Sequence, residues 1–334
     1  MATSAESQAP ARASGRRVPD FFIVGSPKTG TTALYEMLRT HPQIYMPDLK
    51  EPRFLASDMA PAPEHAGERR ELGYPRTLDD YLALFEGARA EQRVGEASTF
   101  YLWSATAAQR IAQLAPDARI IAIVREPASF LRSMHLMFLR WGIEAEQDLR
   151  TAISMEDARR EGRQIPGHSH RPQLLQYSDH VRYVEQLRRY GEHFSRERML
   201  VLVYEDFHRD NDATLRTVMQ FLGVDDGAPI DTTSVNVTTR TVRSWRAKHL
   251  LRSLRSGESP LARSTKATIK TLTTRRLRRR VNRTVRERIV TAAPPPPDES
   301  VMLELRRRYK PEVVALSEYL DRDLVSLWGY EQID

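Results

Sequence analysis

The sequence has 334 residues, of which 40% are hydrophobic and 28% are charged, and its formal net charge is +7. This size is enough for one large hydrophobic core, and no apolar run approaches the roughly 18 to 20 residues that a membrane-spanning helix needs. The lack of cysteine excludes disulfides, thiolate metal sites and cysteine nucleophiles, while the basic balance favours anionic partners such as nucleotides, nucleic acids, acidic glycans or membrane surfaces.

The N-terminal stretch, residues 1–19, lacks the apolar core of a secretory signal. We therefore expect a disordered leader and a cytoplasmic location. Residues 20–334 are expected to form one domain. Within it, residues 245–300 would be a basic insertion of helix and loop, and residues 301–330 would form C-terminal helices.

Three short apolar runs predict buried parallel strands: Asp20–Gly25, Arg119–Val124 and Met199–Tyr204. Stretches with helical spacing of apolar residues lie between and after these runs. The pattern predicts an α/β fold, in which a P-loop-like parallel sheet carries helices on both faces. The expected architecture is a single domain with a basic, mostly helical C-terminal portion.

The first strand leads into a glycine loop, GSPKTGTT, and then into a helix. Glycines let several backbone N–H groups point at one anion, and the helix adds the positive end of its dipole. Lys28 adds a full charge, but it precedes the last glycine of the loop, so this is not a Walker A sequence. We predict an oxyanion-binding loop formed by Ser26, Pro27, Lys28, Thr29, Gly30, Thr31 and Thr32.

A second candidate for phosphate binding follows the second strand. Arg125 stands where that strand would release the chain toward a ligand crevice, and its guanidinium suits a phosphate. Ser133 lies on the helix that follows. Taken alone, Arg125 could instead pair with Glu126, and Ser133 could be an ordinary surface hydroxyl.

These motifs resemble those of sulfotransferases that use 3′-phosphoadenosine-5′-phosphosulfate (PAPS), and most of all the branch with carbohydrate sulfotransferases and their bacterial relatives. GSPKTGTTAL, from Gly25 to Leu34, resembles that family's 5′-phosphosulfate loop. REPASFLRS, from Arg125 to Ser133, resembles the motif whose arginine and serine hold the 3′-phosphate. Further likeness at residues 95–101, 203–206 and 323–328 extends the resemblance from about residue 20 to the C-terminus.

The resemblance implies transfer of a sulfuryl group from PAPS to an acceptor hydroxyl, leaving adenosine 3′,5′-bisphosphate. It also implies that Lys28 stabilises the leaving group and that Glu51 is the general base, with a pKa raised toward neutrality. Another branch uses histidine as the base, so His41, His168 and His170 are rivals, and the last two also suit an acceptor loop. No metal is required, and the sequence has no cluster with metal-ligand spacing.

The sequence is compatible with three kinds of acceptor: a small-molecule alcohol, a glycan and a lipid. Ala97 stands where the family often has a lysine that lines the substrate cleft, which weakens the case for an acidic polysaccharide. Thr99 stands where the family often has proline.

The segment Arg275–Arg288 contains eight arginines in fourteen residues, with Leu277, Val281 and Val285 at helical spacing. It would be a solvated helix packed on the core, a segment closing over the 3′-phosphate, or a contact with a membrane surface or polyanion. We expect no nucleic-acid partner, because the run lacks interleaved aromatic residues.

Two alternative functions remain open from the sequence. The first is a P-loop nucleotide or small-molecule kinase, with Glu205 and Asp206 after the third strand as its magnesium-binding carboxylates. The second is a non-catalytic module that binds nucleotide or polyanion. A requirement for magnesium would distinguish the kinase, because a PAPS enzyme does not need the metal.

Overall fold

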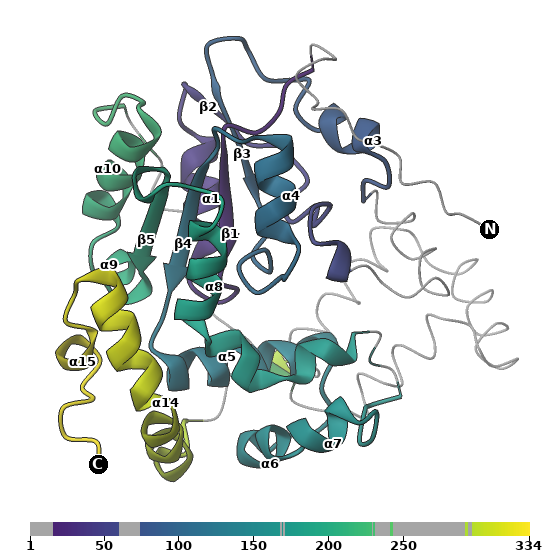
Figure 1. The fold of residues 1–334 in the computed structure, drawn as a ribbon, viewed down its shortest axis with the longest axis vertical. Helices are drawn as coiled ribbons and strands as arrows, with labels where there is room; N and C mark the ends of the chain where they lie inside the picture. Colours follow the sequence, from purple (N-terminus) through teal and green to yellow (C-terminus); the bar gives the residue numbers. More distant parts are fainter. Residues whose placement is uncertain are drawn as a thin grey trace, which may run out of the picture.

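The structure is a computed structural model that describes residues 16–59, 74–167, 169, 171–228, 230 and 296–334, together with the backbone of 241–242 and 291–292. Its centre is a five-stranded, all-parallel sheet with the order β2-β3-β1-β4-β5 (Figure 1). The strands are β1 (Phe21–Gly25), β2 (Ile44–Tyr45), β3 (Arg93–Ala97), β4 (Arg119–Val124) and β5 (Met199–Val203). The predicted α/β fold is confirmed.

One face of the sheet is covered by α1 (Thr31–Arg39) and α10 (Asn211–Leu222). Both helices are amphipathic, and leucines such as Leu34, Leu38 and Leu222 pack on Ile23 and Ile121 of the strands. Burial of such side chains is the main favourable term in folding. This layer holds α1 firmly against β1, so the loop between them has two fixed ends.

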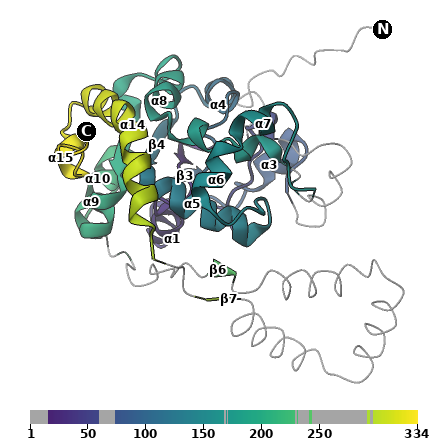
Figure 2. The same cartoon turned by 90° about the horizontal axis from the view of Figure 1, so that it is seen from below.

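The opposite face packs against α4 (Ala107–Leu114), α5 (Pro127–Trp141) and α8 (Tyr183–Gly191). The long helix α14 (Glu299–Leu320) lies on α5 and α8 and leads to α15 (Leu324–Leu327), as Figure 2 shows from below. The expected helical C-terminal portion is therefore present. It brings the last part of the chain beside the end of β4.

The remaining described helices lie around this frame: α3 (Leu78–Ala83), α6 (Leu149–Ser154), α7 (Glu156–Arg160) and α9 (Tyr204–Arg209). Residues 144–148 precede α6 without helical structure, because the Glu144 carboxylate accepts the backbone N–H groups of Ala145 and Glu146. Asp148 then caps a new helix, α6.

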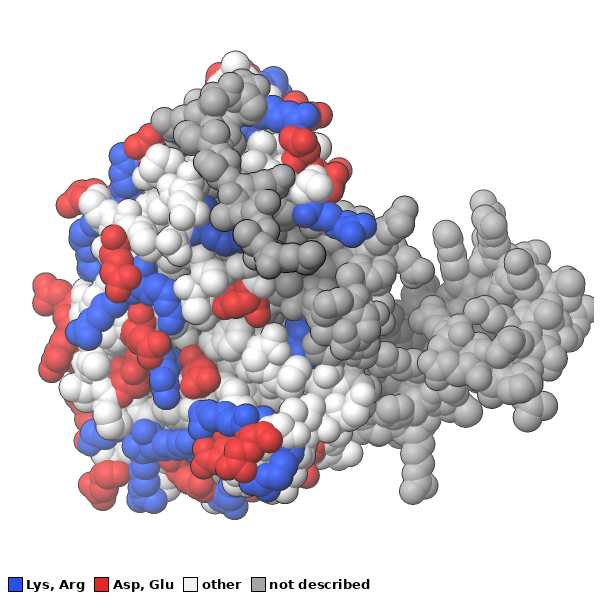
Figure 3. All heavy atoms as spheres, turned by 45° about the vertical axis from the view of Figure 1, so that its right-hand side comes forward, with Lys and Arg blue, Asp and Glu red and all other residues white. Residues whose placement is uncertain are grey.

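A short antiparallel pair joins β6 (Thr241–Val242) to β7 (Thr291–Ala292). The arginine run at 275–288, and most of the predicted insertion at 245–300, lie outside the described residues. Within the described ranges, no helix is both long enough and apolar enough to span a bilayer. On the face shown in Figure 3, basic and acidic side chains are interspersed.

Candidate active site

The loop after β1 is shaped by two glycines. At Gly25 the register between β1 and β4 shifts, and an added Cβ would lie only 2.6 Å from the carbonyl oxygen of Thr99. Gly30 has φ = +85°, a conformation that favours glycine, and it is the residue from which α1 begins. Ser26 N–H donates to the carbonyl oxygen of Ile123 over 2.9 Å. This hydrogen bond ties the loop to β4, and Gly25 lies close to the segment that follows β3.

The N-terminus of α1 is open to an anion. Gly30 provides no side-chain cap, and the first turn of the helix contains no acidic residue. The first N–H groups of a helix need an acceptor, and the helix dipole makes a negative one favourable. By contrast, the carboxylate of Glu126 accepts from Ala128 and Ser129 at the start of α5, so that helix end is already occupied.

The predicted loop residues differ in whether their side chains are used inside the loop or face solvent. The hydroxyl of Thr29 donates to the carbonyl oxygen of Ser26 over 2.7 Å, which braces the loop from inside. Ser26, Pro27 and Thr31 are also buried, whereas Thr32 is exposed. The hydroxyl of Thr29 is therefore used within the loop itself.

Arg125 and Lys28 come together at this edge of the sheet. Arg125 Nη1 donates to the carbonyl oxygen of Lys28 over 3.0 Å, and its guanidinium lies 4.3 Å from the centre of the Tyr204 ring. Its Nε is buried and has no hydrogen-bond acceptor in the part of the chain that the structure describes. Arg125 therefore has a donor that an incoming anion would satisfy.

Positive charge is concentrated around the loop. Burial lowers the pKa of Lys28, and the charges of Arg125 and Arg140 lower it further. Burial also lowers the pKa of Arg132, again with a contribution from Arg125. These cations repel one another, so a multiply charged anion would relieve the repulsion. Sequence reasoning missed Arg140, in the last turn of α5, whose charge acts on Lys28.

Ser133 lies partly buried on α5, next to Arg132. The same helix therefore carries Ser133, Arg132 and Arg140, and it begins at Pro127, two residues after Arg125. This arrangement makes α5 the second wall of the candidate site.

Glu51 lies in the loop that follows β2, with φ = +59°, and Arg53 has φ = +54°. Such angles cost non-glycine residues roughly 1 to 3 kcal/mol and persist only where the surroundings enforce them. Here Glu51 N–H donates to the carbonyl oxygen of Ala97 over 2.9 Å, and Arg53 N–H donates to Ser98 Oγ over 3.0 Å. The residues that follow β3 thus fix this loop at the carboxyl edge of the sheet.

The carboxylate of Glu51 accepts four hydrogen bonds. Lys50 Nζ and Thr99 Oγ1 donate to Oε1 over 3.3 and 3.0 Å, and Arg53 donates to Oε2 through Nε and Nη2. Thr99 also lies against Gly25, so it links Glu51 to the loop that follows β1. Sequence reasoning had not anticipated the roles of Arg53 and Thr99.

The pKa of Glu51 differs from the expectation. Burial would raise it, but the charges of Arg53 and Lys50 and the hydrogen bonds from Arg53 and Thr99 outweigh burial and lower it to about 2. The expected shift toward neutrality is therefore wrong for this arrangement. Glu51 is a carboxylate at neutral pH, and its lone pairs are fully used.

The histidine rivals lie elsewhere or outside the described residues. His41 ends α1, and its ring bonds the carbonyl oxygen of Asp225 over 2.8 Å and the N–H of Gln43 over 3.1 Å. It is therefore at the opposite end of α1 from the loop. His168 and His170 lie outside the described residues. Among the residues that are described, no group of three or more His, Asp or Glu side chains could hold a metal ion.

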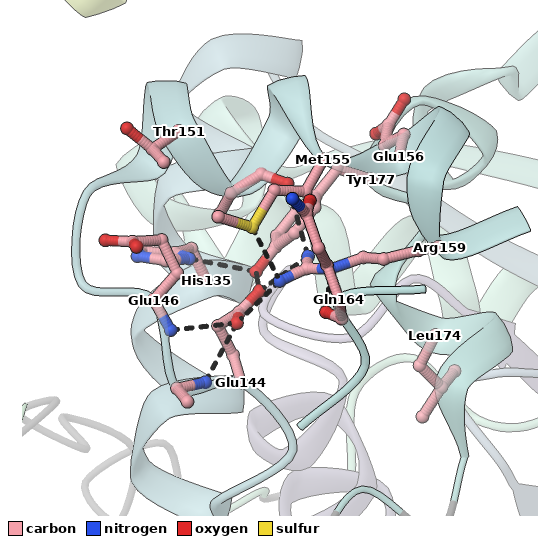
Figure 4. Close-up of polar contacts among 12 residues, drawn as sticks. His135, Glu144, Glu146, Thr151, Met155, Glu156, Arg159, Gln164, Leu174 and Tyr177 are labelled. Atoms are coloured by element: carbon pink, nitrogen blue, oxygen red, sulfur yellow. Dashed lines mark hydrogen bonds and ion pairs between the residues drawn. The ribbon is translucent and has the colours of Figure 1, made fainter. Parts of the chain in front are cut away.

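A buried polar network fixes the segment between α5 and α8 (Figure 4). Arg159 and Glu144 form a two-pronged ion pair at 2.8 and 2.9 Å, and their side chains are only 1% and 0% exposed. Tyr177 donates its hydroxyl to Glu144 over 3.1 Å and is 2.9 Å from His135 Nδ1. Arg159 also donates to the carbonyl oxygen of Gln164, which fixes the chain just after α7.

Comparison with known proteins agrees with this architecture. The sequence model of the sulfotransferase family matches residues 19–227. Carbohydrate sulfotransferase 15 of Mus musculus is 29% identical over 37% of this chain and 28% of its own length. Heparan sulfate glucosamine 3-O-sulfotransferase 6 of Homo sapiens is 32% identical over 34% of this chain and 29% of its own length. The chain thus spans less than a third of these curated relatives.

Among solved structures, a sulfotransferase from Alicyclobacillus acidocaldarius covers nearly the whole chain. The match has a TM-score of 0.63 at 27% identity, over 93% of this chain and 99% of the other. The family model spans more than half of the chain, including β1, its loop, β4 and α5. The chain therefore belongs to the sulfotransferase family.

Proposed function

We propose that the protein transfers a sulfuryl group from PAPS to a hydroxyl of a small-molecule, glycan or lipid acceptor. One observation carries most weight: the uncapped start of α1 lies beside a loop in which Arg125, with an unsatisfied buried Nε, touches Lys28. The loop offers backbone donors and one cation, and α5 offers further cations. A nucleotide with phosphate groups at the 3′ and 5′ positions of its ribose would bind both the loop donors and the cations of α5.

The donor would bind across the loop and α5. The backbone N–H groups from Thr29 to Thr32 would hold the 5′-phosphate at the start of α1. Arg125 and Ser133 would hold the 3′-phosphate, and a guanidinium suits this role because it presents several donors in one plane. Lys28 would lie between them, near the oxygen that bridges phosphorus and sulfur.

The transfer step needs a base, an aligned acceptor and a stabilised leaving group. The acceptor oxygen attacks sulfur and forms the new S–O bond, while the bond between sulfur and the bridging phosphate oxygen breaks. Its electron pair goes to adenosine 3′,5′-bisphosphate, whose new charge Lys28 stabilises. The hydroxyl proton goes to the carboxylate of Glu51.

The hydrogen bonds of Glu51 set a condition on this step. A carboxylate has about four lone-pair sites, and Glu51 already accepts four hydrogen bonds. A donor from Lys50, Arg53 or Thr99 must therefore move before Glu51 can accept a proton from the acceptor. Displacing Arg53 would also raise the pKa of Glu51, which makes it a stronger base.

A binding comparison tests the donor assignment. Adenosine 3′,5′-bisphosphate is expected to raise the melting temperature and to give heat in calorimetry without magnesium, whereas ATP is not. Lys28→Ala and Arg125→Ala should each reduce the shift. A magnesium-dependent response to ATP alone would favour the kinase and overturn the proposal.

A transfer assay tests the chemistry. Radiolabelled PAPS is incubated with extracts that contain candidate acceptors, and the labelled product is identified. Glu51→Gln should still bind adenosine 3′,5′-bisphosphate but lose transfer. Full turnover by this variant would exclude Glu51 as the base.

A further inference from the structure

The peptide bond that joins Arg125 to Glu126 is held on both sides. Tyr183 donates its hydroxyl to the carbonyl oxygen of Arg125 over 3.0 Å, and the N–H of Glu126 donates to Glu205 Oε1 over 3.4 Å. This peptide is the point at which β4 ends and α5 begins. Its orientation sets the direction in which the Arg125 side chain leaves the strand.

The last described segment of the chain holds the two acidic residues. Trp328 Nε1 donates to Glu205 Oε2 over 2.9 Å, and the Tyr330 hydroxyl donates to Glu126 Oε1. Glu126, Trp328 and Tyr330 are almost fully buried, so the Glu126 carboxylate depends on protein donors in place of water, whereas Glu205 is partly exposed. We call Trp328 and Tyr330 the C-terminal clamp.

The C-terminal segment also contacts the start of α9, where Tyr204 supports the Arg125 guanidinium. Tyr204 stacks on Arg125, and the next residue, Glu205, is the acceptor of Trp328. Asp206 follows and forms an ion pair with Arg322. Three consecutive residues after β5 therefore connect the C-terminal segment to Arg125. Figure 1 shows α14 and α15 beside α9.

We propose that the C-terminal clamp positions Arg125 for the 3′-phosphate and thereby sets the preference of the site for a 3′-phosphorylated nucleotide. This inference rests on the proposed function, since it takes the 3′-phosphate as the ligand of Arg125. Lys28 and Tyr204 hold the guanidinium, and the clamp reaches the peptide that follows Arg125 through the carboxylates of Glu126 and Glu205. Partners of this kind tune a binding residue without touching the ligand.

The residues that the family model matches end at 227, about a hundred residues before the clamp. Trp328 and Tyr330 act on Arg125 only because α14 returns along α5 and α8. The clamp is thus a contribution of the C-terminal portion to a site whose ligand-binding residues lie in the first half of the chain.

Calorimetry with two nucleotides tests the inference. Adenosine 3′,5′-bisphosphate and adenosine 5′-monophosphate differ only in the 3′-phosphate. Trp328→Phe and Tyr330→Phe each remove one hydrogen bond and should weaken binding of the bisphosphate about three- to tenfold. Binding of the monophosphate should stay unchanged. Tyr319→Phe, which removes a hydroxyl on α14 that has no acceptor among the described residues, is the matched control.

Equal weakening of both nucleotides would point to general destabilisation and overturn the inference, as would unchanged binding of both. A second arm repeats Tyr330→Phe in an Arg125→Met background. If the clamp acts through Arg125, the second substitution should cost nothing further, because coupled residues are not additive. A further loss of bisphosphate binding in that background would show another route and contradict the proposal.

Binding of the two nucleotides to the wild-type protein distinguishes a failure of the proposed function from a failure of the clamp alone. Wild-type protein that binds the bisphosphate no more tightly than the monophosphate would overturn the proposed function, and the clamp with it. Wild-type protein that prefers the bisphosphate, with both clamp variants keeping the full preference, would overturn the clamp alone.

Discussion

Arg125 Nη1 lies 3.0 Å from the carbonyl oxygen of Lys28, which joins the end of β4 to the loop after β1. The two residues are distant in the sequence, and they meet because β1 and β4 are neighbours in the sheet. In the proposed function they hold opposite ends of one nucleotide. In that proposal, their hydrogen bond would fix the spacing between the groups that hold the two phosphates.

Nucleotide binding should depend on pH through Lys28. Its pKa is lowered by burial and by two arginines, so the ammonium loses its proton below its ordinary value of 10.5. Because the charged form binds the phosphates, affinity for adenosine 3′,5′-bisphosphate should fall as pH rises through this lowered pKa. Lys28→Arg should hold its affinity across the range, since arginine stays charged.

The measurement is calorimetry between about pH 7 and pH 10. An identical decline in the wild type and in Lys28→Arg would mean that another group titrates. Lys28→Met, which has no charge at any pH, should bind weakly throughout and should lower the transfer rate about 10²- to 10³-fold.

Arg53→Met should move the acid limb of the rate profile. The variant removes the strongest partner of Glu51, so the pKa of that carboxylate should rise from about 2 toward its ordinary value of 4.5. The base is active when ionised, so activity is lost as pH falls through the pKa. A higher pKa therefore moves the acid limb of kcat/KM to higher pH.

Arg110→Met is the matched control for this variant, because Arg110 lies over the ring of Phe54 and is not among the groups that bond Glu51. Its acid limb should coincide with that of the wild type. An unmoved limb in Arg53→Met, measured with an acceptor that the wild type sulfates, would exclude Glu51 as the group that titrates.

Gly25→Ala should damage the loop. The added methyl group would meet the carbonyl oxygen of Thr99 at 2.6 Å and Leu102 Cβ at 2.8 Å, and both neighbours are parts of a packed core. Overpacking of this kind costs about 1 to 3 kcal/mol, and the displaced loop should lose nucleotide binding. Gly167→Ala, with nothing within 4 Å, should change neither urea stability nor binding.

Glu144→Gln should strongly destabilise the protein without changing the chemistry of the site. It leaves the buried charge of Arg159 uncompensated, and breaking a buried pair from one side typically costs about 3 to 5 kcal/mol. Urea unfolding measures the loss, and nucleotide affinity of the folded fraction should be unchanged. Glu161→Gln, in an exposed pair with Arg163, should shift stability by less than about 1 kcal/mol.

The sequence predicted those parts of the site that carry local signals. The strand, glycine loop and helix from Asp20 to Arg39 are contiguous, and Arg125 directly follows an apolar strand, so both motifs could be located without a structure. β3 was missed as a strand, because its five residues include Gly95 and Glu96. Glu96 is buried and accepts a hydrogen bond from Tyr81, a partner that only the fold brings close.

The low pKa of Glu51 was missed for a related reason. It depends on the positive φ angles of Glu51 and Arg53, which let the Arg53 guanidinium bond the Glu51 carboxylate. It also depends on a hydrogen bond from Thr99, in the segment after β3. Neither interaction has a signature in residue spacing. The effect of Arg140 on the pKa of Lys28 was also missed, because it depends on how the fold arranges α5 and the loop after β1.

The strand order has a consequence for how the molecule forms. Every pairing in the central sheet is parallel, so no two neighbouring strands are joined by a tight turn. β1 pairs with β3 and β4, and it has no partner until the chain has been synthesised as far as Arg93 and beyond. Such long-range closure makes folding slow. β1, which is apolar up to Gly25, therefore waits for its sheet partners during synthesis, and an exposed apolar strand of this kind is prone to aggregate.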